Sequence, residues 1–403
     1  MSSRPPIGPA GRGVRGSESL ASPTAVASSH HPSLALRPLR FVLLACGLIA
    51  LVVGLWTGLA RLGVGLMGVA PRLVEFHGAL MVCGFFGTLI CIERAVALNR
   101  PLAYFIPLFA AMGVVALLAG TITLAGVAFL SASVALAAAS LWNMRRLQSA
   151  LLALAPSIAA LCWGLGTLTW LAERPLGESA GWWLAFLVLT VAAERLELSR
   201  IVAPPAMAKV VFAAAIAVLL IGVARGELER PLSLFIGSGL ILCGAWLLIY
   251  DLARRTVRLS GQIRFTALCM LLGHCWLIVA GLELLARPLH LVTYWYDAVV
   301  HAITLGFVLS MVFGHALIIF PSVVGLKLRY SPVLYVPLLL LHMSVAIRIV
   351  GDFSGWQDIR SVSGFLTIVA LIGFAITVAV ASIRKRPRAL PGTGNLNGVE
   401  ASR

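Results

Sequence analysis

Four histidines lie in segments that are otherwise apolar, and their imidazoles have the chemistry to bind a metal ion or a haem iron. They are His77, His274, His301 and His342. Neutral imidazole is a common ligand of haem iron and of copper, and two opposed imidazoles from different helices suit a b-type haem. Ionisable side chains are costly inside a membrane, so these positions suggest a function by default.

The composition indicates that the segments around these histidines cross a membrane. The 403-residue chain is 60% hydrophobic and only 11% charged, and its mean hydropathy is +0.99. Apolar stretches of roughly 20 residues, each long enough for a ~30 Å hydrocarbon core, recur along the chain. These properties exclude a soluble domain and predict contact with membrane lipid.

The sequence predicts an all-α, polytopic integral membrane protein with about twelve transmembrane helices. The expected helices cover residues 39–60, 73–98, 102–119, 121–142, 149–171, 180–200, 207–224, 232–250, 264–284, 293–320, 331–349 and 361–383. Residues 39–383 therefore form the transmembrane domain. Residues 1–38 and 384–403 are basic and poor in apolar residues, so we expect two disordered tails.

The net charge of +16 follows the expected topology and does not indicate nucleic-acid binding. Arginine and lysine concentrate in both tails and in alternate connections, whereas the other connections hold most of the acids. The positive-inside rule then places both termini in the cytoplasm, as expected for a multi-pass protein of the bacterial inner (cytoplasmic) membrane.

Other motifs are absent or uninformative. The seven cysteines lie inside apolar helices without a C-x-x-C pair, so we interpret them as small buried hydrophobic residues. No nucleotide-binding motif and no extramembrane catalytic domain is evident, which argues against a nucleotide-driven pump.

The four histidines are expected at similar depth in the outer half of the membrane. His77 lies one to two turns below the outer surface on the second helix, on one stripe with Met81 and Gly84. His301 lies at comparable depth on the tenth helix, His274 near the midplane of the ninth, and His342 in the middle or outer half of the eleventh. For His77 a small-residue packing face is the alternative.

Polar neighbours of these histidines extend the hypothesis. Asp297, one turn before His301, is a candidate to hold its second ring nitrogen, or else an interfacial residue. Arg72, Arg287 and Arg348 lie where haem propionates would emerge, although interfacial arginines would lie there too. We retain Arg348 as a cofactor-binding candidate.

A second polar set is expected at the inner side. Glu93 and Arg94 end the second helix, and Glu194 and Arg195 end the sixth. A structural clasp between Glu93 and Arg195 is favoured over a proton-entry path. His315 has no obvious partner at its depth, so we interpret it as structural.

The chain resembles two related groups of membrane proteins over most of residues 40–383. Twelve helices, a His-Gly pair early in the second helix and a histidine in the outer half of the tenth resemble the catalytic subunit of haem-copper oxidases and nitric oxide reductases. The helix-two histidine, Gly273-His274-Cys-Trp276-Leu and His301-Ala302-Ile-Thr304-Leu-Gly306 resemble the NnrS-type family of haem- and copper-containing membrane proteins linked to nitric oxide stress. The resemblance implies that His77, His301 and His274 are haem or metal ligands.

Two departures narrow what the resemblance implies. Residues 181–223 contain no histidine, so an oxidase-type copper centre cannot form on the sixth and seventh helices, and we do not expect oxygen reduction or proton pumping. The second helix reads His-Gly-Ala-Leu-Met where NnrS-type proteins have His-x-His-Glu-Met, so haem b is better supported than copper. Enzymatic turnover is left open.

The sequence therefore predicts a haem-binding membrane protein that acts in electron transfer or in binding nitric oxide, with a quinone or a soluble electron carrier as partner. The competing hypothesis is a cofactor-free transporter or accessory protein whose histidines line a proton or metal-ion path. Paired Gly/Pro helix breaks and an inverted repeat would favour the transporter. No convincing repeat is found.

Overall fold

The computed structural model describes residues 36–65, 71–144, 150–229, 233–286, 294–325 and 328–383, and these residues form helices without strands. The first half contains α1 (Arg37–Arg61), α2 (Pro71–Glu75), α3 (His77–Ala79), η1 (Leu80–Gly87), α4 (Thr88–Leu98), η2 (Pro101–Tyr104), α5 (Phe105–Leu118), α6 (Ile122–Met144), α7 (Ala150–Leu171), α8 (Leu176–Leu198), η3 (Ser199–Ile201) and α9 (Ala206–Ala224). The second half contains η4 (Glu227–Glu229), α10 (Leu234–Tyr250), α11 (Ala253–Thr256), α12 (Gly261–Leu285), α13 (Trp295–His301), η5 (Ala302–Leu309), α14 (Ser310–Val324), η6 (Pro332–Leu334), α15 (Tyr335–Ser354) and α16 (Gln357–Ile383).

The chain is a multi-pass membrane protein. Among the described residues, 11 helices are long and apolar enough to cross a membrane, and α10 is a shorter apolar helix of 17 residues. Each range expected to be helical has a counterpart. Both predicted tails lie outside the described residues, except residues 36–38, two of which belong to α1.

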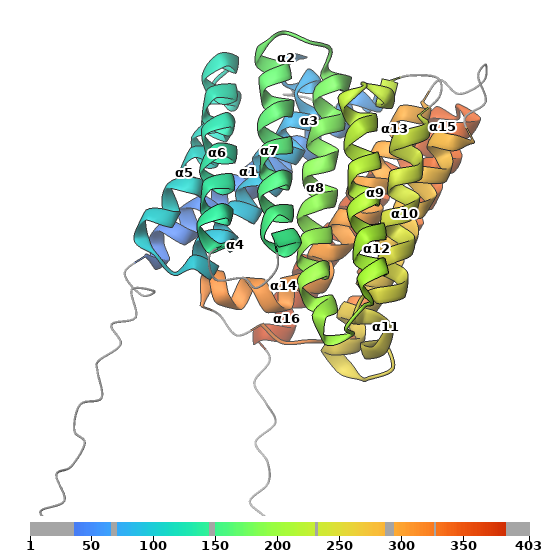
Figure 1. Ribbon diagram of the computed structural model, residues 1–403. Coiled ribbons are helices and arrows are strands. Elements are labelled where there is room, and N and C mark those ends of the chain that lie inside the picture. The colour runs from blue at the N-terminus through green and yellow to red at the C-terminus, as the bar shows by residue number, and fades with distance from the viewer. Residues whose placement is uncertain are drawn as a thin grey trace, which may run out of the picture.

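The helices pack largely in chain order. α5 to α10 form successive neighbouring pairs, α12 packs against α10, and α15 packs against α16 (Figure 1). Glycines make the contacts at which two helix backbones approach closely. Between α10 and α12, for example, a Cβ added at Gly237 would lie 2.9 Å from the Gly281 carbonyl oxygen. Small residues allow such close approach between membrane helices.

Two π-helical segments lie in the middle of the bundle. η1 and η5 each span eight residues inside longer helical runs, and α8 contacts both. π-Helical segments are rare and occur often at functional sites. His77 begins the helical turn before η1, and His301 is the residue before η5.

The two ends of the bundle can be recognised by the short helices that lie there. α2 and α3 lie at one end, and α11 lies at the other together with the start of α1 and the end of α16 (Figure 1). We call these the cavity end and the α11 end.

Candidate functional site

A cavity of about 690 Å³ opens at the cavity end. It is lined by the last turns of α1, the turn from α2 to η1, the first turns of α8, α13 with η5, and facing parts of α15 and α16. Its polar and ionisable lining residues are Arg61, Glu75, His77, Tyr294, Tyr296, Asp297, His301, Thr304, Arg348, Gln357, Arg360, Ser363 and Thr367. Glycines and aliphatic side chains form most of the remaining wall.

His77 is held at this cavity by the backbone of α1. Its Nδ1 lies 2.7 Å from the carbonyl oxygen of Gly54. A carbonyl oxygen only accepts hydrogen bonds, so Nδ1 carries the proton and the neutral ring keeps its lone pair on Nε2. A Cβ added at Gly58 would lie 2.8 Å from Cε1 of His77, so the ring packs directly over this glycine.

His301, which lines the same cavity, is held in the same way. Its Nδ1 donates to the backbone carbonyl oxygen of Asp297 at 2.6 Å, one turn earlier in α13. No hydrogen bond from a described residue reaches Nε2 of His77 or of His301. The two half-buried imidazoles therefore share one tautomer, which leaves the nitrogen most often used for metal ligation free.

Two aspartates and two arginines close one wall of the cavity in a charge-balanced network. Asp297 Oδ2 accepts from Nη2 of Arg348 at 3.2 Å and from Nη2 of Arg360 at 2.8 Å. Asp352, whose side chain is 0% exposed, accepts from Nε of Arg348 at 2.8 Å and from Nε of Arg360 at 2.5 Å. The carboxylate of Asp297 thus pairs with arginines, and only its backbone orients His301.

Only some of the arginines near this end of the bundle line the cavity. Arg61 is exposed at the end of α1 and lines the cavity. Arg360 also stacks over Tyr294, with Cζ 3.4 Å from the ring centroid. Arg72 packs against the turn at Gly120, where an added Cβ would lie 2.7 Å from its Nη1. Arg287 lies outside the described residues. Arg348 lines the cavity.

His342 is placed outside this cavity. Its Nδ1 accepts from the Trp276 indole N–H at 2.8 Å, and the two ring planes are inclined by only 7°. Since Nδ1 accepts, the neutral ring carries its proton on Nε2, which lies 3.4 Å from the Ser310 hydroxyl oxygen. Trp276 in turn packs against Gly306 of η5. The two stretches that carry the family resemblance on α12 and η5 therefore contact one another.

His274 is placed toward the α11 end, buried beside Asp251. Its Nε2 lies 3.5 Å from Oδ2 of Asp251. Asp251 follows α10, and burial raises the pKa of its carboxyl above the ordinary value, against the opposing effects of Arg195 and of the Ala253 N–H. The structure thus brings His77 and His301 to one cavity and places His274 and His342 elsewhere.

His315 has a partner that the sequence did not reveal. Arg195 Nη2 donates to Nε2 of His315 at 2.8 Å, and Nδ1 of His315 donates to the Met311 carbonyl oxygen at 2.8 Å. Among the described residues no ion pair joins Glu93 to Arg195. Arg195 of α8 therefore forms its side-chain hydrogen bond with His315 of α14. The expected ion pair between Arg195 and Glu93 of α4 is not formed.

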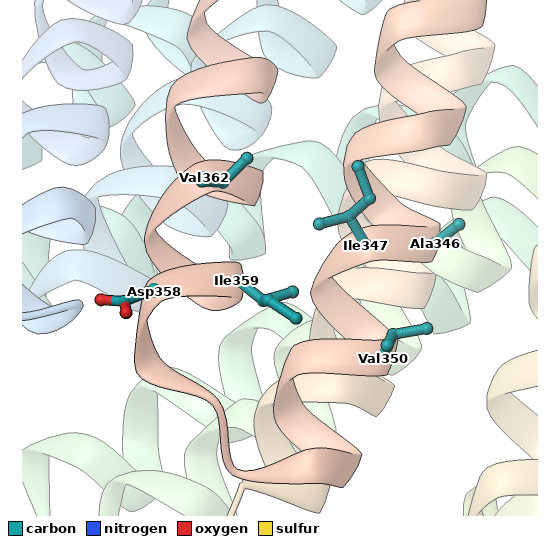
Figure 2. Close-up of a pocket in the computed structure, with 6 residues that line it drawn as sticks. All are labelled: Ala346, Ile347, Val350, Asp358, Ile359 and Val362. Carbon is teal, nitrogen blue, oxygen red and sulfur yellow. The ribbon is translucent and has the colours of Figure 1, made fainter.

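A second concave surface lies between α15 and α16 and carries no comparable chemistry. Figure 2 shows this groove of about 410 Å³, lined by Ala346, Ile347 and Val350 on α15 and by Asp358, Ile359 and Val362 on α16. The Asp358 carboxylate points away from α15, and the facing side chains are apolar. The cavity with His77 and His301 is therefore the candidate site.

Comparison with known protein families gives one match. Residues 40–383 match the family described as "Domain of unknown function (DUF8744)". The chain belongs to this family. The match covers the membrane domain from α1 to the end of α16. No curated protein and no solved structure matches the chain.

Sequence reasoning missed several polar residues of the cavity. Arg61 and Arg360 line the cavity, and Asp352 pairs with two of its lining arginines. All three were expected in the outer connections, where interfacial charges are common. The available signal was the spacing of Arg348 and Asp352, which places them on one face of α15 one turn apart. The π-helical form of η1 and η5 left no recognisable signal in the sequence.

Proposed function

We propose that the protein binds a b-type haem in the cavity, with His77 and His301 as the axial ligands. The observation that carries this proposal is the shared geometry of the two imidazoles. Each donates Nδ1–H to a backbone carbonyl oxygen, and each keeps an unpartnered Nε2 at the same cavity. A fixed tautomer and ring orientation are what a metal-binding histidine requires.

The residues present fit this group. A volume of about 690 Å³ lies within the range of roughly 300–1,000 Å³ typical of cofactor sites. Arg61, exposed at the end of α1, provides positive charge for a carboxylate group at the cavity, whereas Arg348 and Arg360 are already paired with Asp297 and Asp352. Among the described residues no group of three or more His, Cys, Asp and Glu side chains is arranged to hold a metal ion. Two imidazoles suffice for haem, whose iron takes its other ligands from the macrocycle, so haem is favoured over a copper ion.

The proposed setting is the bacterial inner membrane, with about twelve membrane-spanning helices and both termini in the cytoplasm. The distribution of basic residues supports this orientation, which places the cavity in the outer half of the bilayer. The resemblance to NnrS-type proteins and to haem-copper oxidases supports the assignment of His77 and His301.

The haem would supply one-electron chemistry or a binding position for a small diatomic molecule such as nitric oxide. The protein's own residues would orient the two imidazoles, provide the Arg61 guanidinium for a propionate and separate the site from lipid. A quinone or a soluble electron carrier at the cavity end is the proposed redox partner. His274 and His342 take no part as ligands in this proposal.

The first test is haem and metal analysis of the full-length protein purified from a haem-replete host. The proposal expects about one haem b per chain, measured as the pyridine haemochrome. Folded protein that carries neither haem nor copper would refute it. That result would favour the second candidate, a cofactor-free transporter or accessory protein, for which the buried ionisable residues at the α11 end would be the supporting observation.

A further inference from the structure

The α11 end contains buried polar atoms that no contact within the protein satisfies. His274 is 0% exposed, and neither of its ring nitrogens has a hydrogen-bond partner among the described residues. Asp251 is 2% exposed and its Oδ2 is unpaired, as is Nε of Arg195, which is 7% exposed. Leaving a buried polar group without a hydrogen bond destabilises the folded protein, so three such side chains together suggest a functional site.

The charges in this region do not balance. α4 contributes Glu93 and Arg94, α8 contributes Glu194 and Arg195, and the turn before α11 contributes Asp251. The two imidazoles that face these groups are those of His274 on α12 and His315 on α14. Glu197 on α8 is a fourth carboxylate that acts on Glu194, so the carboxylates outnumber the guanidinium groups of Arg94 and Arg195. Binding of a proton would reduce this excess of negative charge.

The hydrogen bonds indicate where that proton would be held. His315 has both ring nitrogens occupied, by Arg195 and by the Met311 carbonyl oxygen. Asp251 Oδ1 accepts from the Ala253 N–H at 2.8 Å, so only its Oδ2 is free, and this oxygen faces Nε2 of His274 at 3.5 Å. Glu93 and Glu194 are half-buried, so the geometry of the fully buried Asp251 and His274 decides the assignment of the proton.

We propose that Asp251 and His274 form a proton-binding site that holds one exchangeable proton between the carboxylate and the imidazole. The proton comes from the aqueous phase at the α11 end and returns there, past the exposed Arg254 and Arg255 of α11. A divalent metal ion is disfavoured, because the Arg195 guanidinium lies in the same cluster and no third ligand is available among the described residues. The site does not depend on haem in the cavity at the opposite end.

The test measures protonation directly in the full-length wild-type protein, reconstituted with histidine labelled in both ring nitrogens. Infrared difference spectra report a protonated carboxylic acid, and ring nitrogen shifts report an imidazolium, from about pH 5 to about pH 9. Asp251→Asn and His274→Gln assign the signals. Glu197→Gln, which changes an exposed carboxylate at the same end, is the matched control.

The expected result is one of these two signatures in the wild type, lost in Asp251→Asn and unchanged in Glu197→Gln. A wild-type protein with neither signature would overturn the proposal, whether or not the variants fold. Retention of one equivalent of added zinc or copper by the wild type, lost in both Asp251→Asn and His274→Gln, would overturn it in favour of a metal site.

Discussion

The imidazole of His77 donates its Nδ1–H to the backbone carbonyl oxygen of Gly54 on α1, at 2.7 Å. One turn further along α1, Gly58 leaves the space that this ring occupies. Two glycines spaced four residues apart on one helix thus fix the position and the tautomer of a histidine on another helix. This contact explains why α1 takes part in a site whose candidate ligands lie on other helices.

Gly58→Ala should weaken haem binding without changing either proposed ligand. The new Cβ would lie 2.8 Å from Cε1 of His77, so the ring must move away from its present position. Loss of an orienting contact commonly costs roughly 10- to 100-fold in metal affinity, and haem retention during purification should fall accordingly. Gly47→Ala on the same helix, where the added Cβ meets Thr88 at an ordinary 3.5 Å, should retain haem. Equal retention in both variants would show that the His77 ring position is not critical.

Asp352→Asn should destabilise the fold strongly. The substitution breaks buried pairs with Arg348 and Arg360 and leaves both guanidinium groups partly uncompensated. Breaking a buried ion pair from one side costs about 3–5 kcal/mol. Chemical unfolding in detergent measures this cost. Glu178→Gln, which breaks the exposed pair with Arg174, should cost less than about 1 kcal/mol, and a similar loss in the two variants would contradict the account.

His342→Gln should preserve the haem spectrum and lower stability. Nδ1 of His342 accepts the Trp276 N–H, so its removal disturbs a half-buried hydrogen bond worth about 1 kcal/mol. Trp276→Phe should have a similar cost, because it removes the same donor. Absorption spectra of both variants report haem retention, and their unfolding curves report stability. Loss of haem in His342→Gln would instead support the ligand role expected from the sequence.

The stability of the protein should depend on pH through Asp251. Because burial raises the pKa of this carboxyl, the folded protein keeps a proton that the unfolded chain releases above about pH 3.9. Wild-type stability is therefore lost as the pH rises from that value to the folded pKa, and Asp251→Asn does not share this loss. The unfolding free energy of Asp251→Asn minus that of the wild type should increase by up to about 1.4 kcal/mol per pH unit and then level off. A difference independent of pH, like that expected for Glu197→Gln, would contradict this assignment.

The helical architecture was largely predictable because each apolar stretch is long enough to cross a membrane and is bounded by charged or turn residues. α10 shows the limit of this reasoning, since its helix of 17 residues lies at the lower end of the roughly 17–25 residues typical of a transmembrane helix. The depth of a histidine was estimated from its distance to the helix end, and His77 and His301, expected at similar depth, line one cavity.

The lateral arrangement of these helices could not be derived from depth alone. His342 was expected at a depth similar to that of His77 and His301, yet it contacts Trp276 outside their cavity. The reason is that depth does not specify which face of α15 meets which neighbouring helix. η1 and η5 change the rotation of the residues that follow, so an ideal repeat of 3.6 residues per turn misassigns their faces. The pairing of Arg348 and Arg360 with two aspartates depends on contacts between α13, α15 and α16, which sequence spacing within one helix cannot give.

The most direct test of the central claim is the reduced-minus-oxidised visible spectrum, with low-temperature electron paramagnetic resonance, of the wild type, His77→Ala and His301→Ala. The account predicts a b-type spectrum with a bis-histidine signal in the wild type, lost or converted in both variants and retained in His342→Gln. A wild-type haem signal that survives in either alanine variant would contradict the assignment of His77 and His301 as the axial pair.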